Sequence, residues 1–247
     1  MTSYKHLSLW MLFGILLSCT KEAARPGAAA LTIVNAVPDS DPSLLPNFGG
    51  AQTLTWYAFD AQIPYGVSFV TGSYSGTQAL TIYHYPDTSE HSTPLYDLTL
   101  HLPVNTIHTL FLTGTMTAPD TLFTTDALPY FPPSDSSLGI RFVNLSYGSA
   151  PVSVNITGRA QGSEVNSLPY KGLTGFIHYP ATSGVSDYTF EFRDAASGSL
   201  IGSCLLSGVN DTYRNTRRYR NFTMAFTGVP SDPSTLKIIL IEAYSSY

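Results

Sequence analysis

The sequence predicts an all-β protein built from two tandem antiparallel β-sandwich domains. Three observations support this fold class: short segments alternate between apolar and polar residues, turn clusters separate these segments, and a series of motifs occurs twice. Composition agrees, because 43% of the residues are hydrophobic and 13% are aromatic, whereas only 12% are charged. Such a chain can bury a core, and its composition argues against disorder and against helical bundles.

The N-terminal segment has the layout of a bacterial lipoprotein signal peptide. Lys5 precedes an apolar run that ends in Leu16-Leu17-Ser18-Cys19, the pattern of a lipobox. This run is shorter than the roughly 20 apolar residues that a membrane-spanning helix needs. We therefore predict that residues 1–18 are removed and that Cys19 carries palmitate, which anchors the chain to the outer membrane. An ordinary signal peptide with an incidental cysteine is the alternative.

Residues 19–29 form the predicted tether between the lipid and the first domain. The segment contains Pro26-Gly27 and several alanines, and it lacks a strand pattern. Lys21-Glu22 resembles the Lys-acidic surface-export signal of some bacterial lipoproteins, with Ala23 where a second acidic residue is preferred. The sequence therefore predicts a lipid-anchored protein that faces the cell exterior, and a periplasmic orientation is the alternative.

Four motifs recur in the same order about 105 to 114 residues apart, which indicates a tandem duplication. The matched pairs are 30–37 with 139–146, 63–65 with 168–170, 81–83 with 189–192, and 109–114 with 223–228. A repeat of this length suits one sandwich domain of about 100 residues. We predict a first domain at 30–129, a linker rich in proline and serine at 130–137, and a second domain at 138–247.

Period-2 alternation and β-branched or aromatic residues define the predicted strands. They are residues 31–34, 53–59, 79–85, 97–102 and 106–113 in the first domain, and 139–143, 152–156, 188–192 and 236–241 in the second. Residues 200–206 form a further strand-like run. The clusters 71–76 and 194–198 are predicted turns, because they combine glycine with serine, aspartate or threonine.

The second repeat resembles the family called domain of unknown function 4397. The resemblance rests on Ile140-Arg-Phe-Val-Asn-Leu-Ser146, on the following Ala150-Pro151-Val152 turn and strand, and on a late strand ending at Gly228. The first repeat matches more loosely at 33–39 and 108–114. The resemblance implies an immunoglobulin-like sandwich on an exported protein, and the family has no established activity. We predict a structural role for Asn35 and Asn144, whose side chains can cap the turn after a strand.

Charge and cysteine content restrict the classes of partner. No lysine or arginine lies between Pro26 and Ile140, while aspartate and glutamate are frequent there. An acidic half disfavours nucleic acid, so no nucleic-acid partner is predicted. Because lipidation uses Cys19, Cys204 has no partner for an intrachain disulfide. We expect Cys204 to act as a small buried apolar residue.

No motif indicates catalysis, a metal or a cofactor. The sequence lacks Gly-x-Ser-x-Gly and His-Glu-x-x-His, and its histidines are not spaced as tight zinc-binding pairs. We therefore predict no catalytic residue, no metal ligand and no cofactor, and we expect a protein that is not an enzyme. A hydrolase whose site cannot be seen in the sequence is the remaining alternative.

Two features are candidate ligand-binding sites. Arg214, Arg217, Arg218 and Arg220 form the basic cluster of the second domain, in a predicted hairpin loop that could bind an anionic glycan, lipid headgroups or an acidic neighbour. A solvated loop is the alternative interpretation. Trp56 could belong to a platform that stacks against sugar, although core packing explains a tryptophan in a strand equally well.

Thr121 is a candidate O-glycosylation site. Asp120-Thr121-Leu122 matches an Asp-Ser/Thr-aliphatic pattern, and a three-residue pattern also arises by chance.

The sequence as a whole predicts an outer-membrane lipoprotein, exposed on the surface, with a non-catalytic role in binding, adhesion or envelope assembly. The alternative is a glycan-binding accessory lipoprotein of a polysaccharide-uptake system. The expected partners are the membrane, through the lipid on Cys19, and either a glycan or an envelope protein.

Overall fold

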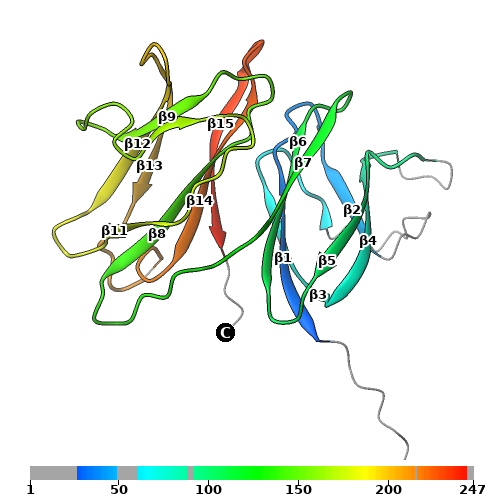
Figure 1. Ribbon diagram of the computed structural model, residues 1–247, viewed down its shortest axis with the longest axis horizontal. Helices are drawn as coiled ribbons and strands as arrows, with labels where there is room; N and C mark the ends of the chain where they lie inside the picture. The colour runs from blue at the N-terminus through cyan, green and yellow to red at the C-terminus, as the bar shows by residue number, and fades with distance from the viewer. Residues whose placement is uncertain (1–26, 49–60, 88–91, 215, 244–247) are drawn as a thin grey trace, which may run out of the picture.

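A computed structural model describes residues 27–48, 61–87, 92–214 and 216–243. These residues form fifteen β-strands and no helix, which confirms the all-β prediction (Figure 1). Within the described ranges, no helix has the length and apolar character needed to cross a membrane. The strands belong to four sheets, two in each half of the chain. We call residues 28–125 unit 1 and residues 137–243 unit 2.

Unit 1 contains two sheets, which we call sheet A and sheet B. Sheet A has the order β3-β1-β6-β7 and sheet B the order β2-β4-β5. Their bounds are β1 Ala28–Asn35, β2 Leu44–Phe48, β3 Ser68–Tyr74, β4 Gly76–His84, β5 Tyr96–Leu102, β6 Ile107–Gly114 and β7 Pro119–Thr125. Strands β1 and β6 pair in parallel, and the other pairs are antiparallel.

Unit 2 repeats this plan in sheet C and sheet D. Sheet C has the order β11-β8-β14-β15 and sheet D the order β10-β9-β12-β13. Their bounds are β8 Ser137–Asn144, β9 Val152–Ile156, β10 Val165–Leu168, β11 Ile177–Pro180, β12 Asp187–Asp194, β13 Leu200–Ser207, β14 Asn221–Val229 and β15 Asp232–Ala243. Strands β8 and β14 pair in parallel, as β1 and β6 do. Each unit is therefore antiparallel except for one central pair.

Most predicted strands coincide with observed strands, and the differences are specific. The predicted turn at 71–76 is wrong, because residues up to Tyr74 belong to β3 and Gly76 already begins β4. Glycine and serine there mark a corner between sheets, not a loop, and Gly76 has a φ of 103° that favours glycine. The predicted strand 53–59 lies outside the described residues.

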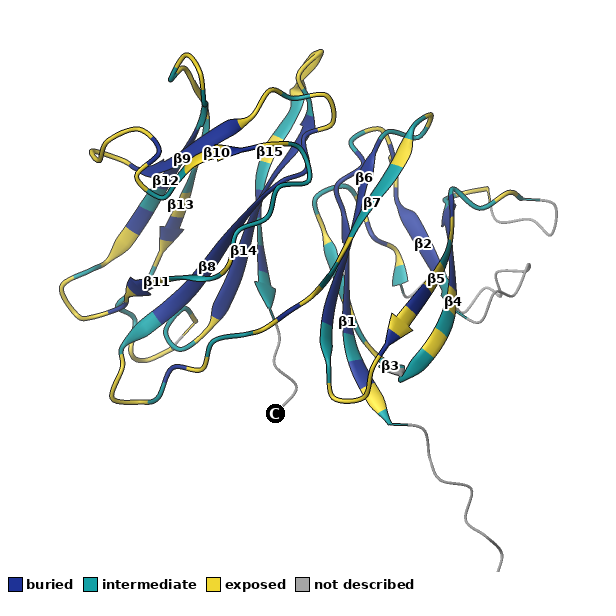
Figure 2. Ribbon diagram, in the orientation of Figure 1, coloured by how far each residue is buried: buried dark blue, intermediate teal, exposed yellow. Residues whose placement is uncertain are grey.

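Sheets A and C lie at the centre of a four-layer arrangement. One apolar cluster lies between sheets A and B, and a second lies between sheets C and D. A third cluster joins sheet A to sheet C through Val34, Phe111, Val143, Ala225 and Ile239. Residues on both faces of β6, β8 and β14 are therefore buried, as Figure 2 shows. The predicted linker leads into this contact, with Phe131 buried against His178.

Each unit contains the same pattern of hydrogen bonds at the turn after its first strand. Asn35 Nδ2 donates to Ser40 Oγ at 2.9 Å and to the Ile63 carbonyl oxygen at 2.8 Å, and its Oδ1 accepts from the Val37 N–H. Asn144 bonds Ser149, Leu168 and Ser146 in the same way. These side chains complete a buried turn, so the structural role predicted for both asparagines is confirmed.

Candidate functional site

The predicted arginine cluster lies in residues 208–220, the connection from β13 to β14. The hairpin prediction is wrong, because β13 belongs to sheet D and β14 to sheet C. Arg217 lies over the Phe222 ring, and Arg218 donates to Ser136 Oγ and lies over the Tyr219 ring. Arg220 pairs with Glu242.

Three of the four arginines in this cluster therefore fasten the loop to its own unit. Arg214 is exposed, and its backbone N–H bonds Asp211. These contacts give Arg217, Arg218 and Arg220 a structural role, and ligand binding by the cluster stays a prediction.

Three other predicted sites have different outcomes. Cys19 and Trp56 lie outside the described residues. Thr121 lies half-buried in β7, where it pairs with Leu112 of the core strand β6. The preceding Asp120 forms an ion pair with Lys171 of unit 2 at 2.9 Å.

Cys204 and the histidines belong to no metal-binding group within the described ranges. Cys204 packs half-buried against the core of unit 2, and burial raises the pKa of its thiol, although nearby Arg217 lowers it. Cys204 packs against the core as expected, but it is half-buried and not buried. Across the described ranges, no group of three or more His, Cys, Asp or Glu residues could hold a metal ion.

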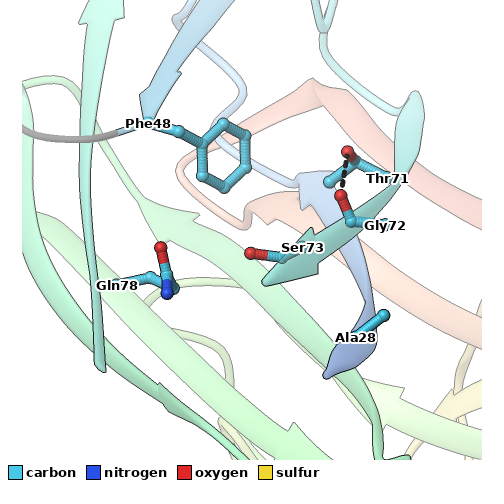
Figure 3. A pocket seen from close by; sticks show the side chains of 6 residues that line it. All are labelled: Ala28, Phe48, Thr71, Gly72, Ser73 and Gln78. Carbon is cyan, nitrogen blue, oxygen red and sulfur yellow. Dashed lines mark hydrogen bonds between the residues drawn. The ribbon is translucent and has the colours of Figure 1, made fainter. Parts of the chain in front are cut away.

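A hollow of about 530 Å³ opens at one end of unit 1, between sheets A and B. Its lining residues are Ala28, Phe48, Thr71, Gly72, Ser73 and Gln78. Figure 3 shows the Phe48 ring, the Ser73 hydroxyl and the Gln78 amide turned toward the same open space. The hollow thus combines one aromatic ring with several neutral polar groups, the usual composition of a site for a small polar ligand.

Strand register explains why polar groups line the interior here. Thr71 pairs with Leu31 and Ser73 with Ala29, and both partners belong to the core between the sheets. Because directly paired residues point to the same face, Thr71 and Ser73 also point inward. Gln78 lies two residues before the core residue Leu80, so it faces inward from the opposite sheet.

Inward polar side chains need an open space. Sealing a hydroxyl or an amide without a hydrogen-bond partner costs roughly 1–3 kcal/mol. Thr71 Oγ1 donates to the Gly72 carbonyl at 3.2 Å, and Gln78 Nε2 donates to the Ser75 carbonyl at 3.4 Å. These long bonds leave lone pairs that water or a ligand can satisfy.

In the second unit, tyrosines occupy the positions that match Ser73 and Gln78. Ala29 and Leu138 each lie six residues before the matched Asn35 and Asn144, and their cross-strand partners are Ser73 and Tyr179. Ser73 in unit 1 therefore corresponds to Tyr179 in unit 2.

The same comparison relates Gln78 to Tyr188. Leu44 pairs with Ile63 and Val152 with Leu168, which aligns β2 with β9. Four residues further on, Phe48 faces Leu80 and Ile156 faces Phe190. Two residues before these partners lie Gln78 and Tyr188. This register also moves the proposed match between 81–83 and 189–192 by two residues.

The two tyrosines close the interior of unit 2. The rings of Tyr179 and Tyr188 meet edge to face with centroids 5.5 Å apart. Tyr179 donates to Glu164 at 2.6 Å and Tyr188 to the Pro180 carbonyl at 2.7 Å, so both hydroxyls are satisfied. At the same two positions of the repeat, tyrosines thus fill the interior of unit 2, whereas Ser73 and Gln78 line the hollow of unit 1.

A smaller hollow of about 300 Å³ lies on unit 2, between the segment just before β9, strand β10 and the turn after β12. Its lining includes Asp194. The carboxylate of Asp194 accepts from the Ser197 N–H at 2.7 Å, and this backbone bond, with one from the Ser197 hydroxyl, lowers its pKa. The carboxylate of Asp194 therefore stabilises a turn.

Sequence reasoning missed Phe48, Thr71, Ser73 and Gln78. Thr71 and Ser73 fell inside a segment that was assigned to a turn, and Phe48 precedes two glycines. The sequence nevertheless contained a signal, because the two repeats share the same alternation of apolar and polar residues but carry different residues at these inward-facing positions. The correct register was needed to read it.

Comparisons with known proteins identify no family. No family model matches the chain, and no curated protein matches it. Similar solved structures include an α-glucan-binding streptococcal virulence factor, at 10% identity and TM-score 0.26, with 85% of this chain and 96% of that chain covered.

Two further similar structures are carbohydrate-binding modules. Family 41 modules from streptococcal virulence factors match at 12% identity and TM-score 0.24, with 85% and 96% coverage. The family 26 module of Eubacterium rectale Amy13K, in complex with maltoheptaose, matches at 10% identity and TM-score 0.26, with 89% and 98% coverage. These TM-scores do not define a shared site, so the argument on function rests on the hollow.

Proposed function

We propose that this protein is a non-catalytic glycan-binding lipoprotein of the outer membrane, and that the hollow of unit 1 binds a neutral sugar. The observation that carries the proposal is that Ser73 and Gln78 line a hollow beside Phe48, whereas the matching positions of unit 2 are interior tyrosines. Of the two roles expected from the sequence, this geometry favours glycan binding over adhesion or envelope assembly. The lipid on Cys19 and the outward orientation remain part of the proposal.

The lining chemistry suits a sugar. A sugar ring presents C–H groups on its faces and hydroxyls around its rim. The half-buried Phe48 ring offers an apolar surface to such a face. The Gln78 amide and the Thr71 hydroxyl can both donate to and accept from sugar hydroxyls.

Charge narrows the ligand to neutral glycans. None of the six lining residues is an acid or a base. The surrounding sequence from 27 to 139 contains no lysine or arginine, so nothing in this unit attracts a sulfate or a uronate. Among the described lining residues, none could act as a general acid or base for hydrolysis.

A hollow-filling variant tests the proposal. The full chain and the Ser73→Tyr, Gln78→Tyr double variant are compared on an array of neutral and anionic oligosaccharides, followed by titration of the strongest neutral probe. We expect the double variant to bind at least about tenfold more weakly, a loss of roughly 1.4 kcal/mol. Its melting temperature should not fall, because unit 2 accommodates tyrosines at the matching positions.

Thr77→Tyr is the matched control. Thr77 is exposed and points to the opposite face from Gln78, so this change adds the same ring outside the hollow. Binding should match that of the unchanged chain. Equal binding by the filled variant, or retention of anionic glycans alone, contradicts the proposal.

A further inference from the structure

The hollow lies at the end of unit 1 where the chain leaves toward its N-terminus. Ala28 is the first residue of β1, and Phe48 is the last residue of β2. Ser73 is next to the last residue of β3, and Gln78 is near the start of β4, which runs antiparallel to β2. All lining strands therefore meet the hollow at one end, and Figure 1 shows β1 beginning at this end.

The start of β1 is held firmly at this end. The Ser75 N–H donates to the Gly27 carbonyl at 2.8 Å, and the Asn105 N–H donates to the Ala28 carbonyl at 2.9 Å. A Cβ atom on Gly27 would lie 2.7 Å from a Val104 methyl, so a larger residue at this position would force the Val104 side chain to shift. The point where the tether joins the sandwich is thus fixed beside the hollow.

The tether is short. Nine residue steps separate Cys19 from Ala28, and a fully extended chain spans at most about 3.3–3.6 Å per residue. An acyl chain on Cys19 therefore holds the hollow within roughly 30 Å of the bilayer surface. The opposite end of the same sandwich, at the β6–β7 turn, lies a full strand length from the start of β1, where the tether is attached.

We propose that the hollow faces the membrane and binds neutral glycans carried by that membrane. This inference rests on the lipid anchor and the glycan-binding role proposed above. A ligand in the same bilayer meets the hollow at the high effective concentration that a short tether imposes, whereas a free glycan does not. Unit 1 has no lysine or arginine that could attract anionic lipid headgroups. The contact of this unit with the membrane therefore depends on recognition of the sugar.

Fluorescence quenching measures the orientation. The full lipidated chain with Cys204→Ser is labelled at Thr77→Cys or, as matched control, at Thr117→Cys, both of which are exposed. Thr77 lies beside the hollow, and Thr117 lies in the β6–β7 turn at the other end. In phosphatidylcholine vesicles with headgroup-nitroxide lipid, we expect severalfold stronger quenching at position 77. Equal or stronger quenching at position 117 overturns the inference and leaves the glycan-binding role standing.

A competition experiment identifies the source of the sugar. The probe is the strongest neutral oligosaccharide of the array, used free or coupled to a dialkylglycerol lipid. The coupled form in the same vesicle should weaken binding of the free form about tenfold more than the coupled form in separate vesicles. Equal competition by both vesicle types overturns the membrane-borne source. A hollow near the bilayer that binds neither form contradicts the glycan-binding role instead.

Discussion

The Arg141 guanidinium of unit 2 forms a bidentate ion pair with the carboxylate of Asp126, which directly follows the last strand of unit 1. Nη1 lies 2.7 Å from Oδ1 and Nη2 lies 3.0 Å from Oδ2. The side chains are only 4% and 1% exposed. Thr109 donates to the same carboxylate, and Arg141 Nε donates to Thr223 at 2.8 Å. The corresponding threonines of the two repeats thus flank one buried pair, and the charges are fully hydrogen-bonded.

Removing one partner of this pair should be costly. Asp126→Ala leaves the guanidinium buried without a counter-charge, which typically costs about 3–5 kcal/mol. The measurement is the free energy of unfolding in urea. Arg220→Ala, which removes a more exposed pair with Glu242, should cost no more than about 1 kcal/mol. Similar losses in both variants would show that the pair between the units does not stabilise the fold.

The buried asparagine of each unit should be equally intolerant. Asn35→Ala and Asn144→Ala each remove three hydrogen bonds and leave the buried partner groups unpaired. We expect each variant to lose about 1–3 kcal/mol or more of its free energy of unfolding. Asn166→Ala changes an exposed asparagine and serves as the control. Melting curves of the three variants test this, and a wild-type midpoint for Asn35→Ala or Asn144→Ala would exclude the structural role.

The free energy of unfolding should fall at alkaline pH because of the Tyr170 hydroxyl. This hydroxyl reaches from unit 2 to Asp120 of unit 1 at 3.1 Å, and burial, followed by the Asp120 charge, raises its pKa to about 12. Because the pKa in the folded chain lies above the ordinary value of 10, its contribution is complete below pH 10 and is lost as the pH rises toward 12.

The Tyr170→Phe variant isolates this contribution. The stability difference between the unchanged chain and Tyr170→Phe should be constant from pH 7 to about 9.5 and then shrink. Subtracting the two curves removes the effect of the other tyrosines. A difference that stays constant to pH 12 would argue against this assignment.

The arginines of the 208–220 loop should divide into structural and neutral positions. Arg218→Ala removes the bond to Ser136 and the contact with the Tyr219 ring, so we expect a loss of about 1–2 kcal/mol. Arg214→Ala should be neutral within about 0.5 kcal/mol. Chemical denaturation measures both changes. Charge reversal at Arg217 and Arg218 that lowers binding to an acidic polysaccharide without unfolding the chain would restore the ligand-binding interpretation.

Lipidation depends on Cys19. Cys19→Ser should abolish incorporation of labelled palmitate and release the protein from the membrane fraction, because a serine offers no thiol to acylate. Cys204→Ser should leave both readouts unchanged, since that thiol packs against the core. Palmitate incorporation that persists in the Cys19→Ser chain would contradict the anchor.

Local patterns predicted several elements well because their physical causes are local. Alternation in residues 97–102 and 152–156 matches β5 and β9 closely, since the period of 2 follows from the pleat itself. The turn after β1 was likewise expected from Asn35, whose side chain bonds residues two and five positions away. Edge strands such as β10 and β11 were missed, because four residues with mixed burial carry too short a pattern.

By itself, the sequence determined the all-β class and the predicted lipidation at Cys19, because each depends on neighbouring residues. It also indicated the duplication, because the same motifs recur in the same order. Only the tertiary structure decided which positions face one another. It joined Asp126 to Arg141 and Tyr170 to Asp120, and it placed Ser73 and Gln78 across one interior from Phe48. Cross-strand pairing brings together residues far apart in the chain, and a shift of one residue would turn each of them to the opposite face.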